Sequence, residues 1–330
     1  MKHHESISAG LWSRRRTMVA AIAALVLLPI EISDAGWLSD LFASPSKHAK
    51  SSKHHKPAKH LASHEPHTAK LAALVPNFAI PSALKSTETC EPAKFRIVLD
   101  VGHTAESEGA ISARNVAEFV FNLRLAKRIE EKLKDEGFAE TRLLVTEGKA
   151  RPSLFRRVSV ANNLHANLLL SIHHDSVPDK FLEKREFEGK KSYFSDRFSG
   201  YSVFVSNKNP HYETSLRFAN LVAKEMKAKG LQYAEQYSQP VMGHYQHPLL
   251  NKETGVYSYD QLIVLKSALS PAVLLEAGSI SNRDEELKMN SPERQDMITS
   301  SVTAAVKEFC ALRSARTPGG SPKMSSDAVH

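Results

Sequence analysis

The chain has 330 residues, and its 44 Lys and Arg against 36 Asp and Glu give a formal net charge of +8 at pH 7. This length allows one large domain or two small ones. Apolar side chains recur with helical or strand spacing only from about Phe95, which favours a single domain. The basic charge suggests an anionic partner, but without an aromatic and basic recognition motif nucleic acid is excluded as that partner.

The N-terminus, residues 1–35, is typical of a signal peptide. Arginines precede an apolar run from Met18 to Ile30 that is too short to span a bilayer comfortably, and small residues follow at Ser33 and Ala35. Such a signal would direct export to the periplasm or the cell wall, and its cleavage would leave no stable membrane span. The arginines fit a twin-arginine signal and an ordinary secretory signal, and an uncleaved anchor is a further alternative.

Residues 36–90 are predicted to be a disordered tether. They contain few large apolar side chains and many Lys, His, Ser and Pro, so they cannot bury enough surface to offset their ordering entropy. Their histidines lack the spacing of one closed metal site, which leaves weak metal binding, attraction to anionic polymers or a passive linker. Residues 313–330, rich in Pro, Gly and Ser, are predicted to be a disordered tail, so the folded domain spans 91–312.

Strands and helices alternate through the first half of this domain. Three apolar runs predict strands and two amphipathic segments predict helices: strands at 97–100, 141–146 and 167–173, and helices at 119–137 and 153–166. Ser153 is the expected cap of the second helix. This order predicts an α/β fold whose strands are buried on both faces.

The second half begins with a charged and aromatic segment, 177–200, which has no clear period and is interpreted as an insertion beside the functional site. Further strands and helices follow it: strands at 201–206, 261–266 and 272–278, and helices at 215–230 and 291–312. Ser291 is the expected cap of the last helix. The loop before the strand at 261–266 contains His244 and His247, which could contact a substrate or lie at the surface.

Side chains with metal-ligand chemistry follow the predicted strands. His103 lies in the loop after the first strand, His173 ends the third, and Glu276 lies in the last. Open α/β sheets gather ligands at the carboxyl edge of their strands. With Glu118 at the start of the first long helix, two imidazoles and a carboxylate make a zinc set with an open position for water. A carboxylate that stays off the metal can act as a base, which is the chemistry of a hydrolase.

The motifs around these residues resemble those of the zinc-dependent N-acetylmuramoyl-L-alanine amidases. LDVGHT around His103, SIHHDS around His173 and LLEAGSISN around Glu276 occur in the order that the family has, with GAI at 109–111 and Glu118 between the first two. Several positions depart from the usual motifs without removing an expected ligand: Val101, Thr104, Ala105, His174 and Ser279. The resemblance covers about 95–310 and implies a mostly parallel twisted sheet of about six strands with helices on both faces.

The resemblance also implies Zn²⁺ as the cofactor and peptidoglycan as the substrate. His103, Glu118 and His173 would hold the metal, and Glu276 would take a proton from water and pass it to the leaving amine. The bond cleaved would join N-acetylmuramic acid to the L-alanine of the stem peptide. Two alternatives stay open, namely a zinc amide hydrolase acting on another envelope substrate and a non-catalytic protein that binds the cell wall.

The same side chains could have other roles. Glu118 could be a helix N-terminal acid, and Glu276 could belong to a salt bridge, for example with Arg157. Because side chains alternate along a strand, His174 should point away from a metal held by His173, toward packing or ligand support rather than direct ligation. Asp175 could orient a histidine ligand through its other ring nitrogen.

Two further expectations concern cysteines and partners. Cys90 and Cys310 flank the folded domain, which in an exported chain favours a disulfide between them over two unpaired thiols. Amidases of the resembling family can carry an inhibitory helix that a partner protein displaces. The interval 206–262 has little room for a long helix of this kind, although 179–200 could act as a lid, so an activator protein is a possible partner.

Overall fold

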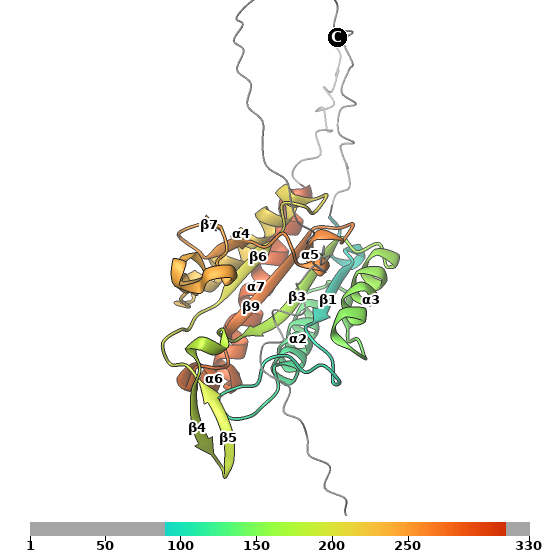
Figure 1. Ribbon diagram of the computed structural model, residues 1–330. Helices are drawn as coiled ribbons and strands as arrows, with labels where there is room; N and C mark the ends of the chain where they lie inside the picture. The colour runs from blue at the N-terminus through green and yellow to red at the C-terminus, as the bar shows by residue number, and fades with distance from the viewer. Residues whose placement is uncertain (1–89, 315–330) are drawn as a thin grey trace, which may run out of the picture. The chain divides into compact units, whose positions relative to one another are not determined.

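The centre of the structure is a sheet of short apolar strands, shown in Figure 1; the computed structural model describes residues 90–314. The strands are β1 (Ile97–Val101), β2 (Thr141–Leu144), β3 (Leu168–Asp175), β6 (Ser202–Val205), β7 (Leu249–Asn251), β8 (Val256–Ser258) and β9 (Ala272–Ser279). They form a 7-stranded sheet in the order β2-β1-β3-β9-β6-β8-β7. β1, β2, β3, and β9 pair in parallel, whereas β6 is antiparallel to β9 and β7 to β8. The predicted mostly parallel α/β sheet is confirmed.

Helices cover both faces of this sheet, as the resemblance implied. The α-helices are α2 (Glu118–Asp135), α3 (Ala150–Asn163), α4 (Tyr212–Ala228), α5 (Ile263–Lys266), α6 (Arg283–Asn290) and α7 (Pro292–Ser314). Short 3₁₀ turns lie at η1 (Pro92–Lys94), η2 (Asp179–Phe181), η3 (Glu235–Ser238) and η4 (Pro240–Tyr245).

The two faces of the sheet have separate cores because side chains alternate along each strand. Ile97 and Leu99 of β1 belong to the core that α2, α4 and α7 cover, whereas Val98 belongs to the core that α3 and α5 cover. All three side chains are buried. This alternation directs successive residues at a strand end to opposite sides of the sheet, which matters for the candidate site below.

The predicted strand at 261–266 is wrong, because this segment contains the short helix α5. Val264 and Leu265 are buried against the sheet, so the apolar run reflects one buried helical turn. A run of four to six apolar residues does not distinguish a buried strand from a buried helix segment. The length and apolar character of this run were therefore not enough to distinguish a helix from a strand.

The two predicted serine caps have different outcomes. Ser153 lies inside α3, which begins at Ala150, and its hydroxyl donates to the Ala150 carbonyl oxygen at 2.7 Å. The cap prediction is wrong there. Ser291 does precede α7, and its Oγ accepts a hydrogen bond from the backbone N–H of Arg294 at 3.2 Å. The second cap is confirmed.

The segment predicted to be an insertion forms a two-stranded antiparallel hairpin, β4 (Glu183–Phe187) and β5 (Lys190–Phe194), which projects from the domain in Figure 1. The residue pairing brings Arg185 opposite Ser192. Both strands are charged, and the consecutive Tyr193 and Phe194 of β5 point to opposite faces, so the hairpin lacks the apolar alternation that identifies a half-buried strand. The hairpin was therefore missed as a structural element.

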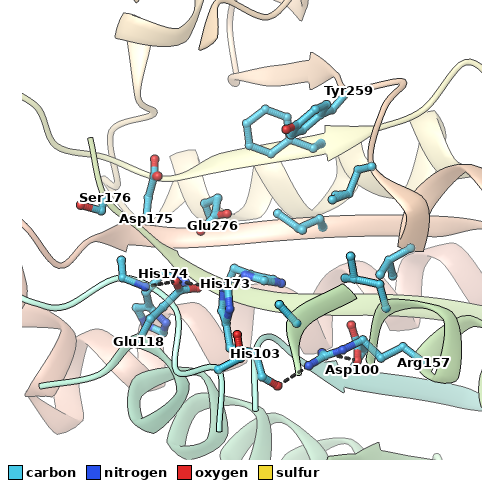
Figure 2. A pocket seen from close by; sticks show the side chains of 18 of the residues that line it. Asp100, His103, Glu118, Arg157, His173, His174, Asp175, Ser176, Tyr259 and Glu276 are labelled. Atoms are coloured by element: carbon cyan, nitrogen blue, oxygen red, sulfur yellow. Dashed lines mark hydrogen bonds and ion pairs between the residues drawn. The ribbon is translucent and has the colours of Figure 1, made fainter. Parts of the chain in front are cut away.

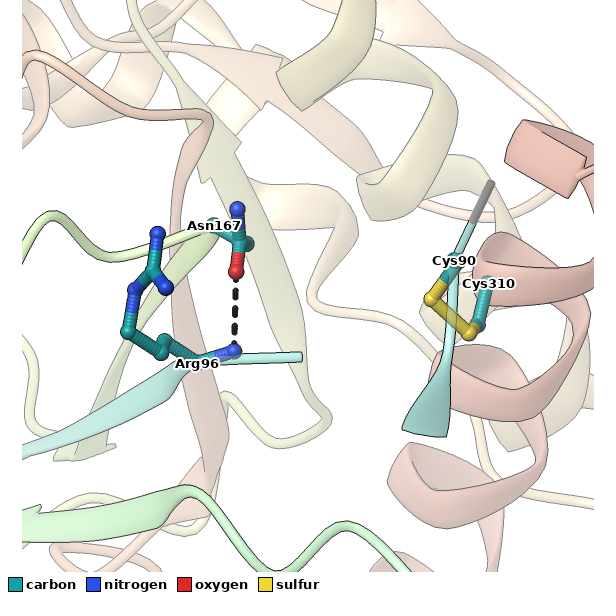
Figure 3. The surroundings of a disulfide bond; sticks show 4 residues. All are labelled: Cys90, Arg96, Asn167 and Cys310. Carbon is teal, nitrogen blue, oxygen red and sulfur yellow. Dashed lines mark hydrogen bonds between the residues drawn. A yellow bond between two sulfur atoms is a disulfide. The ribbon is translucent and has the colours of Figure 1, made fainter. Parts of the chain in front are cut away.

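The predicted disulfide between Cys90 and Cys310 is confirmed, with the two Cα atoms 5.2 Å apart and 220 positions apart in the sequence. Figure 3 shows that it joins the segment before β1 to α7. The predicted signal peptide at 1–35, nearly all of the predicted tether and residues 315–330 lie outside the described residues. Within 90–314, no helix combines the length and apolar character needed to cross a membrane.

Replacing Cys90 with Ala should lower the free energy of unfolding by about 4 kcal/mol, because the bond restricts a very long loop in the unfolded chain. Urea denaturation of the oxidised parent, Cys90→Ala and Cys90→Ala/Cys310→Ala would measure this loss. The two variants should unfold alike, and the reduced parent should resemble them. An unchanged unfolding midpoint in all three would contradict the assigned contribution of the bond.

Candidate metal centre

Three side chains with metal-ligand chemistry meet at the carboxyl ends of β1 and β3. His103, Glu118 and His173 each offer one donor atom, and these atoms lie within 4.8 Å of one another. Glu118 Oε2 lies 3.1 Å from His103 Nε2, and Oε1 lies 2.9 Å from His173 Nδ1. Figure 2 shows the three side chains pointing toward one another. The structure therefore brings together all three residues that the sequence predicted as ligands.

Two glycines allow the chain to approach these donors closely. A Cβ atom at Gly102 would lie 2.5 Å from Cε1 and Nε2 of His173. A Cβ atom at Gly109 would lie 2.6 Å from Glu118 Oε2 and 2.7 Å from His103 Cδ2, and the φ angle of Gly109 is +85°. Since side-chain carbons do not pack at such distances, any other residue would displace a donor. The loop after β1 is shaped around the donor set.

A buried ion pair holds this loop against the sheet. Asp100 of β1 accepts hydrogen bonds from Arg157 Nη1 at 2.8 Å and from Ser171 Oγ at 2.6 Å. The Arg157 guanidinium also donates to the carbonyl oxygens of Val101 and His103. His103 has a φ of 67°, a left-handed conformation that is uncommon for a residue other than glycine. Arg157 thus fixes the backbone of a metal-ligand candidate in this conformation.

Glu118 begins α2 and is held from several sides. Its Oε2 accepts from the backbone N–H of Ala110 at 3.1 Å, and its Oε1 accepts from Asn122 Nδ2 at 3.1 Å. Burial alone would raise the pKa of Glu118, but His103 and His173 hold that pKa well below its ordinary value. The carboxylate is therefore kept ionised, as a metal ligand must be.

His174 points away from the donor set, as the alternation along β3 predicted. Its Nδ1 lies 2.8 Å from Asn122 Oδ1, and the same Asn122 amide donates to Glu118. Burial lowers the pKa of His174 to about 3, so the imidazole is neutral at physiological pH. The contact indicates that His174 supports the carboxylate of Glu118 through Asn122 and does not act as a donor itself.

The hairpin β4–β5 supports the loop between His103 and Glu118. The carbonyl oxygen of Ala113 accepts from Ser192 Oγ at 2.6 Å and from Arg185 Nη2 at 2.5 Å, while the Ala113 N–H donates to Ile280 O at 2.9 Å. Within the described chain, residues 179–200 contribute nothing to the lining of the pocket. In this structure the hairpin contacts the loop and not the pocket, and its role as a lid stays a prediction.

Glu276 lies in β9, where its Cα pairs in register with His173. Its Oε2 atom is buried and has no hydrogen-bond partner among residues 90–314. Burial raises the pKa of Glu276 well above its ordinary value, and the carboxylates of Asp175 and Glu118 raise it further. The alternative of a salt bridge with Arg157 is wrong, because Arg157 pairs with Asp100. An unpaired carboxyl group therefore faces the donor set.

Asp175 does not orient a histidine, so that expectation is wrong. Its carboxylate accepts a hydrogen bond from the Tyr237 hydroxyl of η3. Burial raises the pKa of Asp175 to about 7, and the Glu118 carboxylate adds to the rise, although the Tyr237 hydrogen bond opposes it. Tyr237 comes from a polar segment without a regular period, and no sequence signal pointed to this contact.

A cavity of about 110 Å³ connects the donor set and Glu276 to a group of aromatic side chains. Five rings line this second region: Phe204, Tyr237, Tyr245, His247 and Tyr259. His247 thus faces the pocket. His244 is not among the lining residues in the described part of the chain, and its ring lies 3.9 Å from that of Tyr245. Apart from His247, the sequence analysis missed this aromatic group.

A parallel α/β sheet with two imidazoles, a carboxylate and an unpaired glutamate at its strand ends has the form of a metal-dependent hydrolase. The chain belongs to the N-acetylmuramoyl-L-alanine amidase family (Amidase_3), whose model matches residues 97–308. The family resemblance noted in the sequence is therefore confirmed.

Known proteins agree with this assignment. The chain is 25% identical over 239 residues to the N-acetylmuramoyl-L-alanine amidase AmiA of Escherichia coli (strain K12), covering 64% of this chain and 75% of AmiA. It is 23% identical over 227 residues to the germination-specific N-acetylmuramoyl-L-alanine amidase of Bacillus subtilis (strain 168), covering 64% and 78%. The crystal structure of the amidase Ami1 from Mycobacterium smegmatis has the same fold, with a TM-score of 0.51, 19% identity and coverage of 66% and 98%.

Replacing Asp100 with Ala should lower the free energy of unfolding by about 3–5 kcal/mol, because it leaves the buried Arg157 charge unpaired. Chemical denaturation followed by circular dichroism would measure the loss. Glu140→Ala is the matched control, since Glu140 pairs with Arg142 at 2.9 Å on an exposed surface and should contribute little. Equal stabilities of Asp100→Ala and Glu140→Ala would contradict a supporting role for the buried pair.

Proposed function

We propose that this chain is a zinc-dependent N-acetylmuramoyl-L-alanine amidase. It hydrolyses the amide bond between N-acetylmuramic acid and the L-alanine of the stem peptide in peptidoglycan. Membership of the amidase family supports the choice of bond. The observation that carries the proposal is the cluster of His103, Glu118 and His173 with the unpaired Glu276 facing it.

The donor chemistry fits Zn²⁺. Catalytic zinc is held by three protein ligands, commonly imidazole nitrogens and a carboxylate oxygen, with an open position for water or substrate. Two imidazoles and the Glu118 carboxylate provide this set, and a Cβ at Gly102 or Gly109 would intrude on it. The carboxylates of Asp175 and Glu118 raise the pKa of Glu276, so a cation bound nearby would stabilise its ionised form. Arg157 does not supply this cation, because it is paired with Asp100.

When bound, zinc supplies a Lewis acid that polarises the scissile carbonyl and lowers the pKa of a water molecule. Glu276 accepts a proton from the attacking water and then delivers it to the nitrogen of the leaving L-alanine. The amine therefore leaves as a neutral group. Because burial and neighbouring carboxylates raise the pKa of Glu276, its protonated form is stable enough to make this second transfer.

The surrounding residues keep the reacting groups in place. Arg157 holds the His103 backbone, while Asn122 and His174 hold Glu118 in the orientation that faces both imidazoles. Hydrogen-bonded partners of metal ligands commonly change metal affinity by one to two orders of magnitude. The arrangement around Glu118 is therefore expected to tune zinc binding without adding a ligand.

The proposal includes export to the periplasm or the cell wall, where peptidoglycan is found. The disulfide between Cys90 and Cys310 supports it, because such bonds persist in oxidising compartments and are rare in the cytosol. A signal peptide at residues 1–35 and an activator protein stay predictions. Because the sheet and its helices between residues 91 and 312 carry the whole pocket, we also propose this range as the catalytic domain.

The purified protein should bind about one zinc ion per chain, and removal of His103, Glu118 or His173 should sharply lower the zinc content, since only two ligands would remain. Elemental analysis after dialysis would test this for alanine variants at each position. His165→Asn is the control, because His165 is exposed and asparagine tolerates its φ of 48°. Full zinc content in all three ligand variants would exclude the assigned donors.

Replacing Glu276 with Gln should lower the release of stem peptides at least about a hundredfold, because it keeps the shape of the side chain but removes the proton acceptor. Zinc content and binding to sacculi should remain at the parental level. Mass spectrometry of purified sacculi, digested with and without chelator, would measure release and identify the bond.

The control for this variant is Glu186→Gln, which changes an exposed carboxylate of the hairpin β4–β5. Parental hydrolysis by Glu276→Gln would remove it from the reaction, and loss of zinc would make it a ligand. A parent that binds sacculi but releases no peptide would instead favour a wall-binding protein. Products cut at a different bond would favour another envelope substrate.

A further inference from the structure

The pocket has an aromatic region that the proposed chemistry at the donor set does not use. We call it the aromatic wall and define it as Phe204, Tyr237, Tyr245, His247 and Tyr259. In Figure 2, Tyr259 and the donor set lie on opposite sides of Glu276. A group attached to one side of the scissile amide would therefore extend toward the wall.

The rings of the wall support one another. The Phe204 centroid lies 5.2 Å from that of His247 and 5.9 Å from that of Tyr259, and the His247 and Tyr259 centroids lie 4.2 Å apart. Phe204 is buried, whereas Tyr245, His247 and Tyr259 are only partly buried and leave ring surface at the pocket. Packed rings of this kind form a rigid apolar surface, which binds a ligand without a large ordering cost.

The wall carries no formal charge. Phenylalanine and tyrosine are neutral, and burial lowers the pKa of His247 to about 4, so its imidazole is neutral at physiological pH. The carboxyl groups of Asp175 and Glu276 border the wall in the same pocket. A neutral ligand with hydroxyl groups could form hydrogen bonds with these carboxyl groups whether they are ionised or protonated.

The N-terminal part of α3 also contributes to the pocket. Ala150, Ser153 and Leu154 of the first turns of α3 line it, and the exposed Lys149 and Arg151 lie at the start of that helix. These two cations do not line the pocket in the described chain, but as exposed side chains beside its α3 residues they suit the carboxylates that a stem peptide carries beyond its L-alanine.

We propose that the aromatic wall is a binding subsite for the N-acetylated pyranose ring of muramic acid, and that the stem peptide extends from the donor set toward α3. This inference rests on the proposed function, because it assigns the two sides of the bond cleaved there. The C–H face of a pyranose ring is apolar and flat enough to pack on a tyrosine ring, while its hydroxyl and acetamido groups can reach polar atoms at the edge of the wall. The wall thus sets specificity for the sugar side.

Two soluble substrates with the same stem tetrapeptide test this subsite. One carries N-acetylmuramic acid, and the other carries only the D-lactoyl group, so that the scissile amide is the same and the sugar ring is missing. Steady-state kinetics of the full, zinc-loaded protein on both would separate binding of the ring from chemistry at the amide. The parent should have a KM about tenfold lower for the muramyl peptide.

The decisive variant is Tyr245→Ala, because Tyr245 lies on a surface turn and is only partly buried. It should raise the KM for the muramyl peptide about tenfold, leave kcat near the parental value and leave the lactoyl peptide unaffected. Tyr245→Phe should restore the parental KM, since it keeps the ring. Tyr193→Ala, on the exposed side of the hairpin, is the matched control and should change neither substrate.

Equal effects of Tyr245→Ala on the two substrates, or no effect on either, would overturn the subsite. A parent that hydrolyses neither substrate would contradict the proposed function separately. In that case calorimetric titration of the muramyl peptide into the zinc-loaded parent and Tyr245→Ala decides the question. A tenfold weaker affinity of the variant supports the subsite, and equal affinities overturn it.

Discussion

The candidate site depends on one buried ion pair, between Asp100 at the end of β1 and Arg157 in α3. Burying two charges is costly, and the cost is offset only where every donor and acceptor around them is used well. Here Ser171 also donates to the carboxylate, and Nη1 and Nη2 of the guanidinium donate to the carbonyl oxygens of Val101 and His103, while the buried Nε has no hydrogen-bond partner within residues 90–314. The pair therefore sets the path of the chain as it leaves the sheet. Without it, the His103 carbonyl oxygen would lose the guanidinium hydrogen bond that supports its left-handed conformation.

A second constraint is the concentration of negative charge in the pocket. Glu118, Asp175 and Glu276 share a buried space, and the Oε2 atom of Glu276 has no hydrogen-bond partner within residues 90–314. A buried polar atom left in this state costs about 1–3 kcal/mol of stability. Such a cost is typical of a site kept for function, where a polar group waits for a proton or a cation that the rest of the fold does not supply. The apolar cores on both faces of the sheet provide stability that offsets this cost.

Much of this structure could be predicted from the sequence, and the reasons are local. His103 follows the apolar run of β1, and His173 and Glu276 follow those of β3 and β9. Parallel strands bring their carboxyl ends to one edge, so the meeting of these three residues follows from strand order, and Glu118 joins them from the start of α2. The aromatic wall could not be found in this way. Its rings come from β6, from the turns around Tyr237 and Tyr245 and from the chain after β8, and no periodic pattern relates these segments. α5 was misassigned for the related reason that one buried turn is too short to show a period.

The bond between Cys90 and Cys310 also determines how the domain would respond to mechanical load. Any pull on the chain from the N-terminal side enters the domain at Cys90, seven residues before β1 begins at Ile97. Without the bond, that force would act first on β1 and would strip the strand that carries Asp100 and leads to His103. With the bond, the force passes covalently into α7 at Cys310. The strand that orders the site is thereby shielded from tension.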